Sequence, residues 1–126
     1  MFHSLDLFKA LILLLSIPVL LFGSEDDLLF QPKYESMLNA IQQGEFGEAI
    51  AFARDLVSLT PTSPIGYNSR YILGVLYYRQ QEWKKASDQF EYIINKGKKD
   101  KLYWYSLYYR ANSLLHQKKY LPSAKG

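Results

Sequence analysis

The chain has 126 residues and a formal net charge of +3, with 48% apolar and 16% aromatic residues and no cysteine. This length supports one small domain, and so apolar a composition indicates a globular chain rather than a disordered one. The absence of cysteine excludes disulfide bonds, thiolate nucleophiles, sulfur-ligated metals and lipidation on a cysteine.

The first residues of the chain predict export. Residues 10–23, ALILLLSIPVLLFG, form an apolar run that ends just before the acidic cluster at 25–27. The run has the length of a signal-peptide hydrophobic region, whereas a membrane-spanning helix needs about 20 residues. We expect residues 1–24 to be either a signal peptide or an uncleaved membrane anchor held through residues 10–22. An acidic linker at 25–32 is expected to follow.

The charge is divided unevenly along the chain. Residues 1–78 hold four Lys or Arg against eight Asp or Glu, whereas residues 79–126 hold eleven against four. A solvated lysine-rich face is the simplest explanation of this excess. The functional alternative is an acidic or anionic partner for the C-terminal half.

Aligned with itself, the chain repeats with a period of 37 residues. A period of this size indicates an array of supersecondary units. Five repeat columns share chemistry: Tyr34, Tyr71 and Tyr108; Met37, Gly74 and Ala111; Gln43, Gln80 and Gln117; Phe46, Trp83 and Tyr120; and Ala49, Ala86 and Ser123. We expect units at about 33–66, 67–100 and 101–126, the last of them incomplete.

Each unit is predicted to hold two antiparallel helices. In the second unit, apolar residues follow helical spacing from Tyr71 to Tyr78, and the spacing resumes at Trp83 after a polar turn. Gly74 lies inside the first of these helices, where glycine costs about 1 kcal/mol relative to Ala, so a packing reason is expected. We expect close approach of the two helices at Gly74 and Ala86.

The second unit resembles the tetratricopeptide repeat, whose pattern is W-x2-L-G-x2-Y, then A-x3-F, then P. Leu73, Gly74 and Tyr77 match its first part, and Ala86 and Phe90 match its second. The 37-residue spacing and the linker Pro61-Thr62-Ser63 resemble one branch of this repeat family. That branch occurs in bacterial cell-envelope proteins such as the outer-membrane assembly lipoprotein and the Tol-Pal coordinator. The resemblance implies an all-α superhelix of antiparallel helix pairs, with about two and a half repeats.

The resemblance also implies a concave groove, lined by the first helix of each pair, that binds a protein or peptide segment. Tyrosine suits such a groove because its ring offers contact area and its hydroxyl hydrogen-bonds a peptide backbone. The implied groove positions are Tyr34, Leu38, Ile41, Asn68, Tyr71, Val75, Tyr78, Arg79, Tyr105, Tyr108, Asn112 and His116. The binding candidates among them are Tyr71, Tyr78, Arg79, Tyr105, Tyr108 and Asn112.

Most aromatic residues of the stretch 71–90 are assigned to packing between helices. The implied packing positions are Leu73, Gly74, Tyr77, Trp83, Ala86 and Phe90. An aromatic stripe at helical spacing is usually core, so core packing stays open as an alternative for Tyr71 and Tyr108.

Other functional classes have little support in the sequence. His3 and His116 are the two histidines, no Gly-rich phosphate loop is present, and no Ser or Thr has an evident base. We therefore expect no enzyme activity, cofactor, metal or nucleic acid. The expected function is a protein-protein interaction scaffold in the periplasm or cell envelope, with or without an inner-membrane anchor. The alternative is an assembly component that pairs with another copy or chain through its uncapped third repeat.

Overall fold

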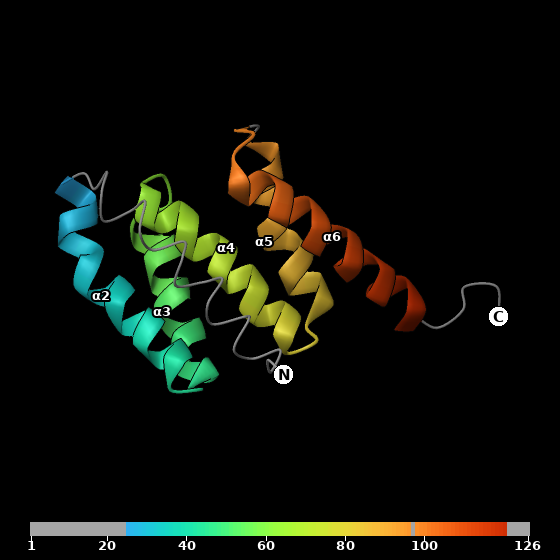
Figure 1. Ribbon diagram of the computed structural model, residues 1–126, viewed down its shortest axis with the longest axis horizontal. Helices are drawn as coiled ribbons and strands as arrows, with labels where there is room; N and C mark the ends of the chain where they lie inside the picture. Colours follow the sequence, from blue (N-terminus) through green and yellow to red (C-terminus); the bar gives the residue numbers. More distant parts are fainter. Residues whose placement is uncertain (1–24, 97, 121–126) are drawn as a thin grey trace, which may run out of the picture. The chain divides into compact units, whose positions relative to one another are not determined.

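The computed structural model describes residues 25–96 and 98–120, and every regular element within these ranges is an α-helix (Figure 1). The all-α prediction is therefore confirmed for this part of the chain. The helices are α2 (Glu25–Gln42), α3 (Phe46–Leu59), α4 (Pro64–Arg79), α5 (Trp83–Asn95) and α6 (Lys101–Tyr120). The predicted hydrophobic segment at 10–22 lies outside the described residues.

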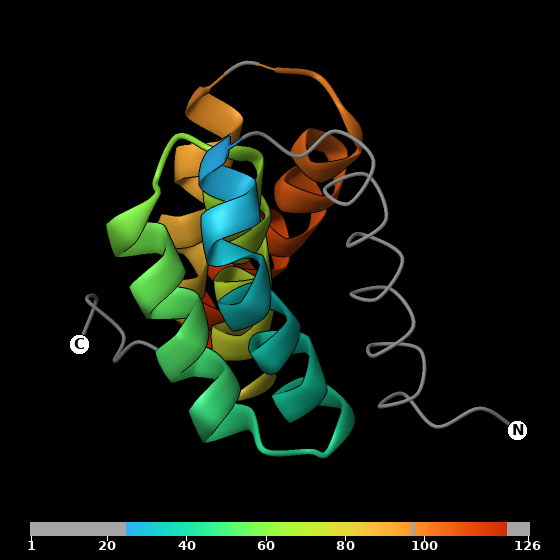
Figure 2. The same ribbon diagram turned by 90° about the vertical axis from the view of Figure 1, so that its left-hand side faces the viewer.

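The chain divides into two compact units, one up to Ile72 and one from Leu73 onward, so α4 contributes to both. In the first unit, α2 and α3 lie side by side and run antiparallel (Figure 2). In the second compact unit, which begins at Leu73 and is called the second unit from here on, α5 and α6 lie side by side (Figure 1). Buried apolar side chains from α2 to α6 form the cores of the two units. They are Tyr34, Met37, Ile41, Ala53 and Leu56 in the first unit, and Leu73, Leu76, Ala86, Phe90, Ile93 and Leu102 in the second.

Residues 25–32, for which the sequence predicts a linker, form the first turns of α2. The Asp27 side chain is buried, and its Oδ1 accepts a hydrogen bond of 3.1 Å from the backbone N–H of Ile65. Ile65 lies in the first turn of α4, where backbone N–H groups lack partners within the helix. The acidic cluster is thus part of the folded unit, because one of its carboxylates satisfies the start of another helix.

The turns between α2 and α3 and between α4 and α5 have the same geometry, 37 residues apart. Gly44 has φ +77° and Gln81 has φ +64°. The N–H of Glu45 donates to the Ala40 carbonyl at 2.8 Å, and the N–H of Glu82 donates to the Tyr77 carbonyl at 2.9 Å. A left-handed residue followed by a bond back into the last turn is a common way to end a helix.

The starts of α4 and α6 are equivalent in the same way. The Ser63 hydroxyl oxygen accepts a 3.1 Å hydrogen bond from the N–H of Gly66, and the Asp100 carboxylate accepts one of 3.1 Å from the N–H of Tyr103. Both are N-cap interactions, and Pro64 occupies the first helical position, where its missing N–H costs nothing. Two turns and two helix starts thus recur at a spacing of 37 residues.

Gly74 has a packing reason. A Cβ placed on Gly74 would lie 2.8 Å from ring carbons of Phe90, on α5. Phe90 lies one turn after Ala86, the residue for which the sequence predicts close approach to Gly74. The ring of Phe90 can lie close to this helix because glycine has no side chain there.

Candidate protein-binding surface

The second unit is built around a cluster of aromatic rings. The fully buried Phe90 stacks on Tyr109, with ring centroids 5.3 Å apart and an interplanar angle of 14°. Tyr78 meets Tyr109 edge to face at 5.0 Å. Trp83 contacts Tyr78 edge to face at 5.2 Å and stacks on His116 at 4.1 Å, with an interplanar angle of 11°. Contacts of this kind add about 0.5–1.5 kcal/mol each beyond the burial of area.

Local structure explains how these rings meet. Tyr78 lies in the last turn of α4 and Trp83 at the start of α5, so the left-handed turn at Gln81 places the two rings close together. Tyr109 and His116 are seven residues apart on α6 and therefore share one face of that helix. The cluster thus connects the three helical segments of the second unit.

Tyrosine side chains of α4 and α6 contact Tyr109 in this cluster. Burial raises the pKa of the Tyr109 phenol, and the neighbouring hydroxyls of Tyr108, Tyr78 and Tyr105 raise it further. Burial also raises the pKa of Tyr78, with a smaller contribution from Tyr108. Tyr108 and Tyr109 meet edge to face at 5.3 Å. Three of the predicted groove residues, Tyr78, Tyr105 and Tyr108, are therefore brought together around Tyr109.

We call Tyr78, Tyr105 and Tyr108 the tyrosine surface. Tyr108 is 64% exposed, whereas Tyr78 and Tyr105 are half-buried. Asn112 lies one turn after Tyr108 and is half-buried; its side-chain N–H group donates to the Tyr108 carbonyl at 3.1 Å. Arg79 follows Tyr78 and is exposed, so it presents a positive charge in the same unit.

The other groove positions have different surroundings. Tyr71 is fully buried in α4, so its ring offers no surface to a partner. Its repeat equivalent Tyr34 is also fully buried, and this burial raises the pKa of its phenol well above the usual range. Buried side chains also occupy the remaining groove positions in the first three helices, namely Leu38, Ile41, Asn68 and Val75.

The residues assigned to packing between helices are mostly enclosed. Leu73, Gly74, Tyr77, Ala86 and Phe90 are buried, and Trp83 is half-buried against Tyr78 and His116.

Sequence reasoning missed two features of the second unit. It gave no role to Tyr109, which falls 37 positions after the buried Ile72. It also did not single out the exposed Trp104 and Leu115 on α6, although their helical spacing places them on one side of that helix.

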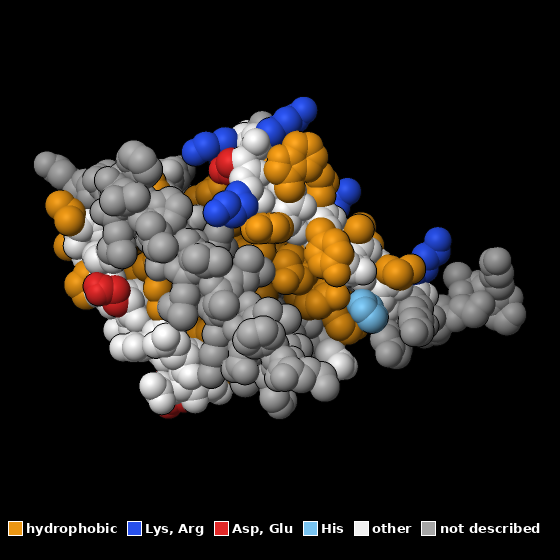
Figure 3. Space-filling model, viewed as in Figure 1, with side chains coloured by type: hydrophobic (Ala, Val, Ile, Leu, Met, Phe, Trp, Pro, Cys, Tyr) orange, Lys and Arg blue, Asp and Glu red, His pale blue; other side chains and the backbone are white. Residues whose placement is uncertain are grey.

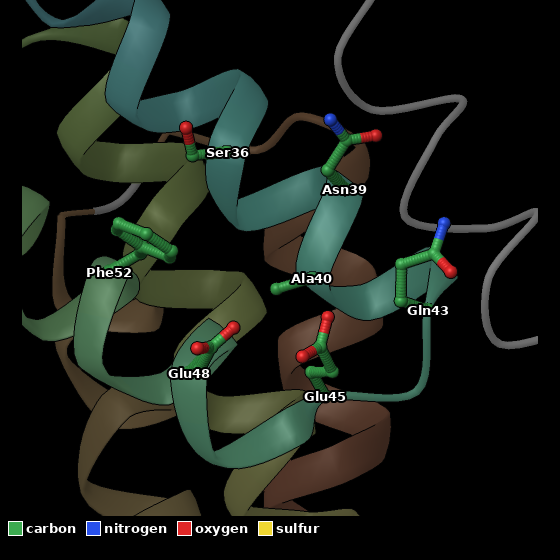
Figure 4. A pocket seen from close by; sticks show the side chains of 7 residues that line it. All are labelled: Ser36, Asn39, Ala40, Gln43, Glu45, Glu48 and Phe52. Carbon is green, nitrogen blue, oxygen red and sulfur yellow. The ribbon is translucent and has the colours of Figure 1, made fainter.

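A separate hollow lies between α2 and α3 in the first unit, with a volume of about 280 Å³. Figure 4 shows side chains from both helices around it, including the carboxylates of Glu45 and Glu48. The other residues that line it are Ser36, Asn39, Ala40, Gln43 and Phe52. This lining mixes polar side chains with one aromatic ring.

Across residues 25–96 and 98–120, no three His, Cys, Asp or Glu side chains are grouped so as to hold a metal ion. None of the helices in these ranges combines the length and the apolar character needed to cross a membrane. Comparison with protein-family models, with curated proteins and with solved structures finds no match for this chain.

Proposed function

We propose that this chain is a non-catalytic scaffold of the bacterial cell envelope that binds a segment of a partner protein at its second helical unit. The observation that carries the proposal is the tyrosine surface: Tyr78 and Tyr108 contact the half-buried Tyr109, and Tyr105 lies one turn before it on α6. Rings that are already held by their neighbours lose little conformational entropy when a partner binds.

The 37-residue recurrence of helix boundaries and turns supports a tetratricopeptide-like array as the framework. In such an array, each helical hairpin presents its first helix to a bound segment. Here α4 contributes Tyr78 and Arg79, and α6 contributes Tyr105, Tyr108 and Asn112. Arg79 favours a segment that carries a carboxylate, because guanidinium and carboxylate groups form charge-assisted hydrogen bonds. Export of the chain is part of the proposal and rests on the apolar run at 10–23.

The proposal is tested by selecting peptides from a random display library against the whole chain in neutral detergent. We expect peptides rich in acidic residues, and we expect Tyr105→Ala and Tyr108→Ala each to weaken their binding about tenfold or more. Tyr108→Phe keeps the ring and should weaken binding less. Tyr92→Ala is the matched control. This tyrosine is also half-buried, but it is not part of the tyrosine surface: it lies on α5, where its ring contacts Lys96.

Two results would contradict the proposal. One is a selection that enriches no peptide. The other is a set of peptides that bind the Tyr105→Ala and Tyr108→Ala variants as tightly as the unmodified chain. Circular dichroism of each variant establishes that the helices are retained, so that a loss of binding is not a loss of fold.

A further inference from the structure

One side of α6 exposes apolar side chains between Trp104 and Leu115. Trp104 is 57% exposed, Leu114 46% and Leu115 63%; Leu107 and Ala111 lie between them on the same side of the helix. We call these five residues the apolar face of α6. In Figure 3, hydrophobic side chains gather over α6, with Lys and Arg side chains beyond both ends of the group.

The fold does not need this face for its own core. The opposite side of α6 supplies the buried Leu102, Ser106 and Ser113, and α6 packs against α5. A helix that is apolar on two sides is expected to be covered on both. Tyr108 borders this face, because it lies four residues after Trp104 and seven before Leu115, whereas Tyr105 and Asn112 lie farther around the helix.

The charges around the face point to an anionic partner. Lys98, Lys99 and Lys101 are exposed at its N-terminal end, and Lys118 is exposed at its C-terminal end. Within residues 98–120, Asp100 is the single acidic residue, and its carboxylate already accepts a hydrogen bond from the N–H of Tyr103. Lysines at a helix N-terminus oppose the helix dipole and so cost the fold some stability. An anion outside the described chain would compensate this cost.

We propose that the apolar face of α6 docks on an anionic lipid surface. The helix is about 30 Å long at 1.5 Å per residue and can lie flat in the interface between headgroups and acyl chains. Trp104 is a residue type that favours this interface, and Tyr103 packs edge to face against it at 4.9 Å. The lysines keep their charges among the lipid phosphates while their alkyl stems lie along the apolar face.

Other occupants fit these observations less well. Two copies of α6 would bring together two helices that carry lysines and no carboxylate, so like charges oppose self-association. A standard protein interface uses about 20–30 residues on each side, whereas this face offers five. The inference is independent of the proposed peptide binding, and it concerns a different set of side chains.

The test uses the whole chain and the emission of Trp104. Trp83→Phe leaves Trp104 as the single tryptophan. We expect a blue shift and protection from acrylamide quenching with vesicles of phosphatidylcholine and phosphatidylglycerol, but not with phosphatidylcholine alone. The neutral vesicles account for any binding through residues 10–22, which does not place Trp104 in lipid. In the converse variant, Trp104→Phe, the remaining Trp83 stacks on His116 and should report no change.

Charge variants test whether the lysines contribute to lipid binding. Removing each of Lys98, Lys99 and Lys101 by substitution with Gln should weaken the response to anionic vesicles about fivefold. The control is the double variant Lys84→Gln and Lys85→Gln, since these lysines pair with Asp88 and Glu82 on another helix and should matter less.

Three outcomes would overturn the proposal. Trp104 could stay in water with anionic vesicles, it could shift equally with neutral vesicles, or it could respond to a polyglutamate peptide and not to vesicles. The last of these outcomes would identify an acidic protein as the occupant. None of these outcomes decides whether peptides bind the tyrosine surface, which is measured with the Tyr105→Ala and Tyr108→Ala variants, so the two proposals fail separately.

Discussion

Gly44 and Gln81 hold the same left-handed backbone conformation at equivalent positions of two successive turns. Their φ angles are +77° and +64°, and the hydrogen bonds that follow them match residue for residue. Glycine adopts this conformation freely, whereas a residue with a Cβ loses about 1–2 kcal/mol. The second turn therefore carries a strain that the first turn avoids.

This difference predicts opposite effects of two substitutions. Gln81→Gly should stabilise the chain by about 0.5–1 kcal/mol, because relief of strain exceeds the added entropy of the unfolded state. Gly44→Ala should destabilise it by about 1 kcal/mol through the backbone alone, since a Cβ there would meet nothing within 4 Å. Urea unfolding measures both. Gln80→Gly is the control, and a stabilisation there as large as that at Gln81 would contradict the explanation.

The parts of the fold that the sequence predicted are those with local causes. The turn after Arg79 and the start of α5 at Trp83 follow from apolar spacing and a polar turn, which act within a few residues. The N-terminal boundary of α2 could not be predicted in this way. Its first turns depend on Asp27, whose hydrogen bond to Ile65 spans 38 positions in the chain.

In the candidate site, too, the sequence predicted which residues share a helix but not which of them are exposed. Repeat spacing correctly placed Tyr105 and Tyr108 on one helix, but it could not distinguish the buried Tyr71 from the exposed Tyr108, which share a column. Burial depends on which helices surround each copy, and the spacing of residues along the chain does not contain that information. For the same reason, the contact between Gly74 and Phe90 could not be predicted from the sequence.

Gly74→Ala should destabilise the chain by up to about 2 kcal/mol. Alanine is the better helix former by about 1 kcal/mol, but its Cβ would lie 2.8 Å from the Phe90 ring. That ring is fully buried and stacked on Tyr109, so it cannot move aside, and overpacking costs about 1–3 kcal/mol.

A double-mutant cycle tests the cause of this loss. Phe90→Leu removes the clashing ring atoms, so Gly74→Ala should cost less in that background than in the unmodified chain. The free energy of unfolding of all four proteins provides the comparison. Strictly additive effects would show that Phe90 is not the obstacle.

Asp27→Ala should destabilise the chain by about 1–3 kcal/mol. The substitution removes a buried acceptor and leaves the N–H of Ile65 without its partner at the start of α4. Asp27→Asn keeps an oxygen at the same place and should cost less. Hydrogen exchange at Ile65 is the direct measurement: its protection should fall in the Ala variant and be largely kept in the Asn variant. Equal losses in both would assign the role of Asp27 to its charge.

Alkaline pH should unfold the chain through its buried tyrosines. Burial raises the pKa of Tyr34 and of Tyr109 in the folded state, whereas in the unfolded chain a tyrosine titrates near pH 10. Above about pH 10 the unfolded state therefore releases these protons first, and the free energy of unfolding falls as pH rises toward the folded pKa values. Below pH 10 both states hold the protons, and these groups leave stability unchanged.

The slope of this loss identifies the residues responsible. One tyrosine that stays protonated only in the folded state contributes up to about 1.4 kcal/mol per pH unit. Urea unfolding between pH 9 and 12 should show a shallower decline for Tyr34→Phe, and a smaller change of the same sign for Tyr109→Phe, whose ring is less enclosed. Tyrosinate absorbance of the folded chain should lose its last titrating phase in the Tyr34→Phe variant. A decline that is as steep in this variant as in the unmodified chain would show that Tyr34 does not set the alkaline limit.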